Sequence, residues 1–337
     1  MNRCFSPILL GVVLALVAGC VSATPFPAPV PPSATPNLPT ATSAPPAETL
    51  SPTDTPIIPT VTPELATPDE SALNITYTCN DGFIIAFHGK KILIDALFQE
   101  PRIPCYTDSE EVAAMTLARP PFDDVDLILV SHEHSDHFEP QIVGACLQNN
   151  PQAVLVSKGS VIDELKKRFS GFDRVRDRVR GVQLAEKESA QMKIRGIDLE
   201  IINAPADVPN LGFLIHVGGL TLFHTGDSGI NRAMVDLFQS YHLPDKRIDL
   251  AFVPWQYLGD EWYHPLVEKG IQAKNYVPMH FVGDDAAWVF KAVPTYYPQA
   301  ILFRSKMQAW VYSPPAPPIP PPTTPRPTSR WLATGSG

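Results

Sequence analysis

The fold can be predicted from one segment, which reads Asp126-Leu127-Ile128-Leu129-Val130-Ser131-His132-Glu133-His134-Ser135-Asp136-His137. It opens with a short apolar run that is typical of a buried strand, and the run leads directly into three histidines and one aspartate. A loop that leaves a strand can turn these side chains toward one centre, whereas the helical period would do so for only part of the set. Imidazole and carboxylate together suit zinc, iron or manganese. We therefore predict a metal site here rather than a histidine-rich surface loop, because the chain has only 9 histidines in 337 residues.

The N-terminal residues have the pattern of an export signal. Residues 1–19 combine Arg3 with an apolar run from Ile8 to Ala18, as in a secretory signal peptide, and this run is too short to span a bilayer. Leu16-Val17-Ala18-Gly19 before Cys20 resembles the lipobox of bacterial lipoproteins, which implies that Cys20 is diacylated, for instance with palmitate, and becomes the new N-terminus. We expect a lipid-anchored, extracytoplasmic protein of the bacterial cell envelope. The alternative is an ordinary signal peptide with a chance cysteine at its end.

Most of the 38 prolines lie in two segments that flank a more ordinary body. Residues 20–70 are rich in Pro and Thr, and residues 313–337 are rich in Pro, so both are expected to be extended and disordered. The predicted folded body is 71–312, which is long enough for one domain with a substantial core. The formal net charge of −9 argues against a nucleic-acid partner and leaves a small-molecule substrate as the expectation. The sequence does not indicate an oligomeric state.

Three cysteines remain once the signal is removed and Cys20 is lipidated: Cys79, Cys105 and Cys146. An odd number outside the cytoplasm permits one disulfide at most, and sequence separation favours Cys79 with Cys105. Three free thiols are the alternative. None of the three lies in a Cys-x-x-Cys pair, so a cysteine metal site is not predicted.

The body opens and closes with β-rich runs. Runs at 75–78, 83–87 and 91–95 predict a β-meander, Gly218-Gly219 predicts a later hairpin, and 301–303 and 309–312 predict the last strands. Helical patterns are interleaved in each half. This order predicts an α+β fold with two sheets packed face to face and helices outside.

The pattern His-x-His-x-Asp-His after a strand resembles the signature of the metallo-β-lactamase superfamily. Three further motifs extend the resemblance over nearly the whole body: Asn80-Asp81-Gly82-Phe83 with Lys91-Ile92-Leu93-Ile94-Asp95, Phe223-His224-Thr225-Gly226-Asp227, and Val277-Pro278-Met279-His280. The last two are similar to the branch that contains the ascorbate-6-phosphate lactonase. The resemblance implies a four-layer αββα sandwich and a metal-dependent hydrolase.

The resemblance also implies a pair of divalent metals, with zinc expected first and manganese or iron as alternatives. It assigns His132 and His134 to the first metal, it assigns Asp136, His137 and His280 to the second, and it makes Asp227 the bridge. Two such cations lower the pKa of a shared water, which predicts hydrolysis of an ester, lactone or phosphoester by a metal-bound hydroxide. Asp136 would orient this hydroxide or take its proton.

One histidine of this family pattern is absent, because 203–210 contains none. Asp207 is the nearest residue that could replace it, and a carboxylate there would favour manganese or iron. A weak or empty first site, or recruitment of His216 from the next strand, are the alternatives. His224 and Asp95 are expected to support the ligands rather than to bind metal.

Two functions follow from these observations. The first is the hydrolase, and the alternative is a catalytically weak metal-binding surface module on the same fold. Cleavage of β-lactams is not indicated, because the fold hosts many chemistries. His264 lies near four aromatic residues and could line a substrate cleft, although packing is the other interpretation; the aromatic residues are Trp255, Tyr257, Trp262 and Tyr263.

Overall fold

The computed structural model describes residues 72–101, 108–281 and 285–312. The predicted signal peptide, the lipidation residue Cys20, the stalk, the C-terminal tail and Cys105 lie outside these residues, so the expectations for them stay predictions. Within the described residues, no helix is long and apolar enough to cross a membrane.

A seven-stranded sheet carries the N-terminal half of the body and the last strand. Its order is β13-β1-β2-β3-β4-β5-β6. The meander and β13 pair antiparallel, whereas the strands from β3 to β6 pair parallel. The strands are β1 Leu73–Cys79, β2 Gly82–Phe87, β3 Lys90–Ile94, β4 Leu127–Val130, β5 Val154–Lys158, β6 Val179–Val182 and β13 Ala309–Tyr312.

A six-stranded sheet carries the C-terminal half, in the order β12-β11-β10-β9-β8-β7. The strands from β7 to β10 pair antiparallel, and those from β10 to β12 pair parallel. The strands are β7 Ser189–Ile194, β8 Ile197–Asn203, β9 Leu211–Val217, β10 Leu220–His224, β11 Leu250–Pro254 and β12 Asn275–Met279.

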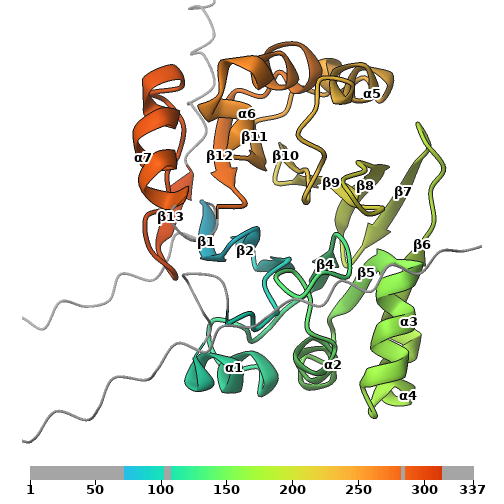
Figure 1. Ribbon diagram of the computed structural model, residues 1–337. Helices are drawn as coiled ribbons and strands as arrows, with labels where there is room; N and C mark the ends of the chain where they lie inside the picture. Colours follow the sequence, from blue (N-terminus) through green and yellow to red (C-terminus); the bar gives the residue numbers. More distant parts are fainter. Residues whose placement is uncertain (1–71, 102–107, 282–284, 313–337) are drawn as a thin grey trace, which may run out of the picture. The chain divides into compact units, whose positions relative to one another are not determined.

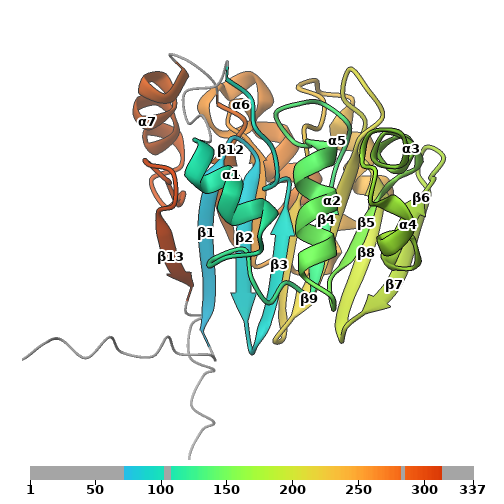
Figure 2. The same cartoon turned by 90° about the horizontal axis from the view of Figure 1, so that it is seen from below.

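The two sheets face each other, and helices cover their outer faces (Figures 1 and 2). The helices α1 to α4 lie over the first sheet, and α5 and α6 lie over the second (Figure 1). The predicted four-layer αββα sandwich is therefore confirmed. The helices and helical turns are α1 Ser109–Thr116, α2 Pro140–Asn149, α3 Gly159–Arg168, α4 Phe172–Val175, η1 Arg176–Arg178, α5 Met234–Ser240, η2 Leu243–Lys246, α6 Gln256–Gly259, η3 Glu261–Tyr263, η4 Leu266–Ile271 and α7 Asp285–Tyr296.

Strand β4 shows why this sequence forms a four-layer fold. Leu127 and Leu129 point into the core between the two sheets, whereas Ile128 and Val130 point into the core beneath the helices. All four side chains are buried. A strand covered on both faces must be apolar at every position, which explains its uninterrupted run. Burial of both faces also makes the end of β4 that leads into the histidine segment rigid.

The turns of the predicted meander and of the predicted later hairpin are both tight. Residues at the β2–β3 and β9–β10 turns have positive φ, at 47° and 68° for His88 and Gly89 and at 58° and 79° for Gly218 and Gly219. Two successive positive φ values match the right-handed twist of the flanking strands.

Cys79 is disulfide-bonded, and Cys146 is a buried free thiol. The pairing of Cys79 with Cys105 stays a prediction.

One predicted strand is wrong. The run Ile301–Phe303 is not a strand, because its contact with β12 is a backbone hydrogen bond from Ile301 N to Tyr276 O at 2.9 Å, after which the chain turns toward β13. This change does not alter the sheet order that positions the site.

Candidate metal centre

Strand ends from both sheets bring the predicted site residues to one edge of the sandwich. The histidine segment follows β4 beside Asp95, which follows the parallel strand β3, while Asp227 and His280 follow β10 and β12. Carboxyl ends of parallel strands meet at the same edge of a sheet. The turn that contains Asn80 and Asp81 joins the same edge, because β2 starts where the antiparallel β3 ends, with Phe83 opposite Ile94.

His132 is held in the tautomer that a metal ligand needs. Ser131 Oγ donates to Asp95 Oδ2 at 2.6 Å, so it accepts from His132 Nδ1–H at 3.0 Å. This leaves a lone pair on His132 Nε2, which is buried and has no hydrogen-bond partner among the described residues. Burial and the nearby charge of His137 lower the pKa of His132 to about 2, so the ring is neutral at physiological pH.

His137 presents its Nε2 to the same space. Its Nδ1 lies 3.2 Å from Asp95 Oδ2, and its buried Nε2 also has no hydrogen-bond partner among the described residues. Burial by itself would lower the pKa of His137, but the hydrogen bond with Asp95 and the charges of Asp81 and Asp95 raise it to about 10. The same contacts lower the pKa of Asp95 against the effect of its burial. Without a metal ion, both ring nitrogens of His137 are protonated, and a cation that binds at Nε2 would displace the proton there.

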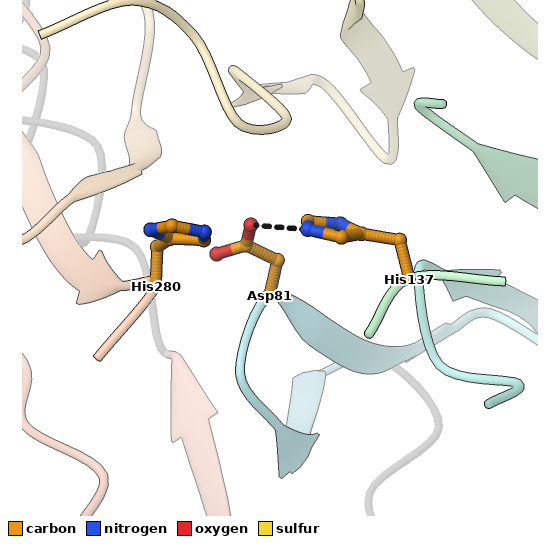
Figure 3. Close-up of side chains that lie close together, drawn as sticks. All are labelled: Asp81, His137 and His280. Carbon is orange, nitrogen blue, oxygen red and sulfur yellow. Dashed lines mark ion pairs between the residues drawn. The ribbon is translucent and has the colours of Figure 1, made fainter. Parts of the chain in front are cut away.

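Asp81 joins this centre, although the sequence analysis gave it no role beyond its place in the family motif Asn80-Asp81-Gly82-Phe83. Its side chain is fully buried, and its Oδ2 lies 3.5 Å from His137 Nε2. Figure 3 shows the carboxylate between the rings of His137 and His280. Ligand atoms of these three residues all lie within 4.8 Å of one another. Burial raises the pKa of Asp81 to about 7.

Asp227 and His280 complete the convergence. One ligand atom each from His132, His137 and Asp227 forms a second group within 4.8 Å. Asp227 Oδ1 also lies 3.5 Å from His280 Nε2, so this aspartate is near the members of both groups. Its backbone N donates to Asn210 Oδ1 at 3.2 Å, which orients the start of its loop. The structure therefore brings together four of the predicted ligands.

The other predicted ligands lie at the margin of the centre or outside it. Asp136 Oδ2 is 3.7 Å from His137 Nε2 and accepts from Asn80 Nδ2 at 3.0 Å. His134 is exposed, and its ring centroid lies 4.5 Å from that of His132. Neither belongs to the two groups, and nor does Asp207, which is exposed. His216 of β9 lies opposite Thr221 at the start of β10, whereas the site lies beyond the other end of β10. The prediction that His216 could serve as a ligand is therefore wrong.

Supporting residues tie the ligand-bearing loops together. His224 Nδ1 accepts from Gly226 N at 3.1 Å, which makes its Nε2–H the donor to Asp81 O at 2.8 Å. The ring thus joins the Asp81 turn to the Asp227 loop, and burial lowers its pKa. The expectation that His224 and Asp95 support the ligands fits these contacts. His264 instead packs against Tyr296 and Tyr297, each with a ring centroid 5.0 Å away.

Glu133, which had no assigned role, connects the histidine segment to a cleft. Its Oε2 lies 3.0 Å from both Lys158 Nζ and Ser160 Oγ. Burial would raise the pKa of Glu133, but its hydrogen bond with Lys158 lowers it. The cleft has a volume of about 600 Å³, and its lining includes Glu133, Lys158 and Asn210. Because Asn210 also contacts Asp227, the cleft borders the loops that carry the ligands.

The donor set fits divalent cations. His132 Nε2, His137 Nε2 and both carboxylate oxygens of Asp81 are buried without hydrogen-bond partners among the described residues. Leaving a buried polar atom unpaired costs about 1–3 kcal/mol, and an unpaired charge costs more, so a native fold does not keep such a cluster without a function. Imidazole nitrogens and carboxylate oxygens are ligands for zinc, iron and manganese. A cation would satisfy these atoms together.

A family model for the beta-lactamase superfamily domain matches residues 90–296, which is more than half of the chain. The chain belongs to the metallo-β-lactamase superfamily. The matched region contains the histidine segment, Asp227 and His280. The prediction of a metal-dependent hydrolase of the metallo-β-lactamase superfamily is confirmed at this level.

Relatives and solved structures agree with this assignment. A UPF0173 metal-dependent hydrolase from Heliobacterium modesticaldum is 26% identical over 222 residues, which are 62% of this chain and 82% of the relative. Another from Pyrococcus abyssi is 28% identical over 203 residues, 57% of this chain and 77% of the relative.

Two solved superfamily-like structures share the fold. A possible metal-dependent hydrolase from Veillonella parvula has a TM-score of 0.52 at 11% identity, covering 71% of this chain and 99% of that one. A metallo hydrolase from Ignicoccus hospitalis has a TM-score of 0.50 at 17% identity, covering 72% and 99%. At these identities the likeness concerns the fold alone.

Proposed function

We propose that this superfamily member hydrolyses an ester, a lactone or a phosphoester of a small molecule with two divalent cations in its centre. The observation that carries the proposal is the convergence of buried, unpartnered ligand atoms from His132, His137 and Asp81 with Asp227 and His280. Zinc is the first candidate for the cations, and manganese or iron are the alternatives. Bound cations would lower the pKa of water and stabilise negative charge that develops on the substrate.

Asp136 is the residue placed to handle the proton. Its Oδ2 accepts from Asn80 Nδ2, so the position of the carboxylate is set by the β1–β2 turn. Its Oδ1 has no hydrogen bond to a described residue, and the side chain is 23% exposed. A carboxylate fixed at one oxygen and open at the other can take a proton from an attacking water at Oδ1. We therefore assign Asp136 the role of general base.

The substrate class rests on two features. The motifs around Asp227 and His280 resemble the branch that contains the ascorbate-6-phosphate lactonase, which supports a lactone among the candidates. The cleft beside Glu133 and Lys158 is about 600 Å³, which is a suitable size for a small molecule.

Turnover by metal-loaded protein tests the proposal. The full-length chain is incubated with Zn²⁺ or Mn²⁺ and given one chromogenic ester, one γ-lactone, one phosphodiester and one β-lactam. We expect hydrolysis of at least one of the first three, which chelation abolishes and which Asp136→Asn lowers by about 10²-fold or more. Metal binding without turnover of any substrate would contradict the enzymatic proposal.

A second function is favoured by one observation. Among the predicted ligands of the first metal, His134 is exposed and lies outside both groups, and Asp207 is exposed as well. A weakly held first metal would leave a metal-binding surface module with little catalysis. One tightly bound cation per chain and no turnover is the result that this alternative predicts.

For its location, we propose that the domain is exported and tethered to the membrane by acyl chains on Cys20. The order of charged, apolar and small residues before Cys20 supports this, and the Pro/Thr-rich 21–70 would act as a spacer. Cys20 lies outside the described residues, so this proposal rests on the sequence.

A further inference from the structure

We propose that Asp81 is itself a metal ligand, placed beside His137 and His280, and that its carboxylate raises the affinity of the centre for Mn²⁺ relative to Zn²⁺. The inference rests on the proposed two-cation centre and deepens it. The family resemblance assigned no ligand to the β1–β2 turn. Asp81 supplies a donor in a chain that lacks one histidine of the family pattern.

Within the described part of the chain, the charge of Asp81 has an ion-pair partner but no hydrogen-bond donor. Both carboxylate oxygens are buried and make no hydrogen bond with described residues. His137 Nε2 lies 3.5 Å from Asp81 Oδ2, which is longer than a hydrogen bond. One ion pair without hydrogen bonds does not offset the cost of burying a carboxylate, which is several kcal/mol. A cation between Asp81 and the two imidazoles would compensate this charge.

The orientation of the Asp81 carboxylate is also fixed. Figure 3 shows one oxygen facing the ring of His137 and the other facing the ring of His280. The backbone that carries it is fixed on two sides, because His224 Nε2 donates to Asp81 O and His280 N donates to Asn80 O at 3.4 Å. Gly82 is required next to it, since a Cβ there would lie 2.2 Å from Thr78 Oγ1. A turn held this closely does not swing its side chain toward solvent.

The chemistry of the set supports the metal preference. With Asp81, the centre and its margin contain three carboxylates, from Asp81, Asp136 and Asp227. Oxygen donors suit manganese, whereas imidazole suits zinc and iron. Removing one carboxylate should therefore weaken Mn²⁺ binding more than Zn²⁺ binding.

The decisive experiment compares metal binding by the full-length wild type, Asp81→Asn and Asp126→Asn. Asp126 is a matched control, because its buried carboxylate pairs with Lys90 at 3.0 Å and lies at the start of β4, the end opposite the site. Calorimetric titration with Mn²⁺ and Zn²⁺ should show that Asp81→Asn lowers Mn²⁺ affinity by about 100-fold or more and Zn²⁺ affinity by a smaller factor. The Asp126→Asn affinities should match the wild type.

Cobalt absorption gives a readout that a structural role would not change. With Co²⁺ bound, loss of a ligand alters the visible bands, so the Asp81→Asn spectrum should differ from the wild type. If Asp81→Asn does not fold, Asp81→Glu keeps the charge and must still change the spectrum. Wild-type affinities with an unchanged spectrum would overturn the assignment, and equal losses for both metals would overturn the preference. If the wild type binds no metal, this result would instead contradict the proposed function.

Discussion

Asp95 Oδ2 lies 3.2 Å from His137 Nδ1, and both side chains are fully buried. The same oxygen accepts from Ser131 Oγ, and Oδ1 accepts from Ser131 N at 2.7 Å. Through Ser131, this carboxylate also determines the tautomer of His132. One residue that the proposed centre does not use as a ligand therefore orients two histidines that it does.

Asp95→Asn should lower metal affinity by about 10- to 100-fold, because an amide has one accepting oxygen, whereas Asp95 accepts from Ser131 N at Oδ1 and contacts His137 and Ser131 Oγ at Oδ2. Titration with Zn²⁺ measures the change, and circular dichroism checks that the variant is folded. Ser131→Ala is the partner variant and should show a smaller loss, since Asp95 keeps its contact with His137. Wild-type affinity in Asp95→Asn would contradict the orienting role.

Asp227→Ala should lower metal content more than His280→Ala. Asp227 belongs to the group with His132 and His137, and it also lies 3.5 Å from His280, so its loss affects both parts of the centre. Metal per chain after dialysis, measured by mass spectrometry, gives the comparison. Equal retention of metal by the two variants would show that Asp227 does not bridge.

Asp207→Ala tests whether Asp207, rather than Asp81, replaces the histidine ligand that is absent from this chain. Asp207 is exposed and outside both groups, so we expect this variant to keep the metal content of the wild type if Asp81 is the additional ligand. Selective loss of one metal per chain would instead assign the donor to Asp207.

Cys146 should be protected from alkylation up to strongly alkaline pH. Burial raises its pKa from 9.0 to about 12, against a smaller opposite effect of the hydrogen bond from Asn150. The folded state therefore keeps the thiol protonated where the unfolded state releases the proton. The stability from this group is complete below pH 9 and is lost as the pH rises toward 12, by up to about 1.4 kcal/mol per pH unit. Cys146→Ala should remove this slope in denaturant melts.

Peptide mapping after iodoacetamide at pH 8 gives the chemical check. Cys146 should be unmodified in the folded protein and modified once the protein is unfolded in urea. Rapid modification of the native protein would mean that the thiol is more accessible than its position in α2 indicates.

Cys20→Ser should move the protein out of the membrane fraction or leave its signal unprocessed, because acyl chains on this residue are the only anchor proposed. Fractionation of expressing cells with immunoblotting measures it. Export through an unrelated cleavable signal, without Cys20, should give a soluble protein that binds metal as the wild type does. Unchanged processing and membrane association of Cys20→Ser would remove the lipid anchor.

The fold class and the position of the centre along the chain could be predicted from the amino-acid sequence. A fully apolar strand before a cluster of histidines can be recognised locally, because burial on both faces and a ligand-rich loop each leave a pattern in consecutive residues. The same holds for His280 and Asp227, which stand in motifs whose order along the chain is expected for the superfamily.

Which of the candidate ligands lie close together depends on the tertiary structure. Asp81 had the local signature of a turn aspartate, and nothing within its own segment indicates that antiparallel pairing of β2 with β3 brings it between His137 and His280. His134 and Asp207 had the right chemistry but lie exposed, outside the two groups. A local pattern shows the type of a side chain. A set of ligands is instead defined by distances between residues that are far apart in the chain, and only the packing of the two sheets sets these distances.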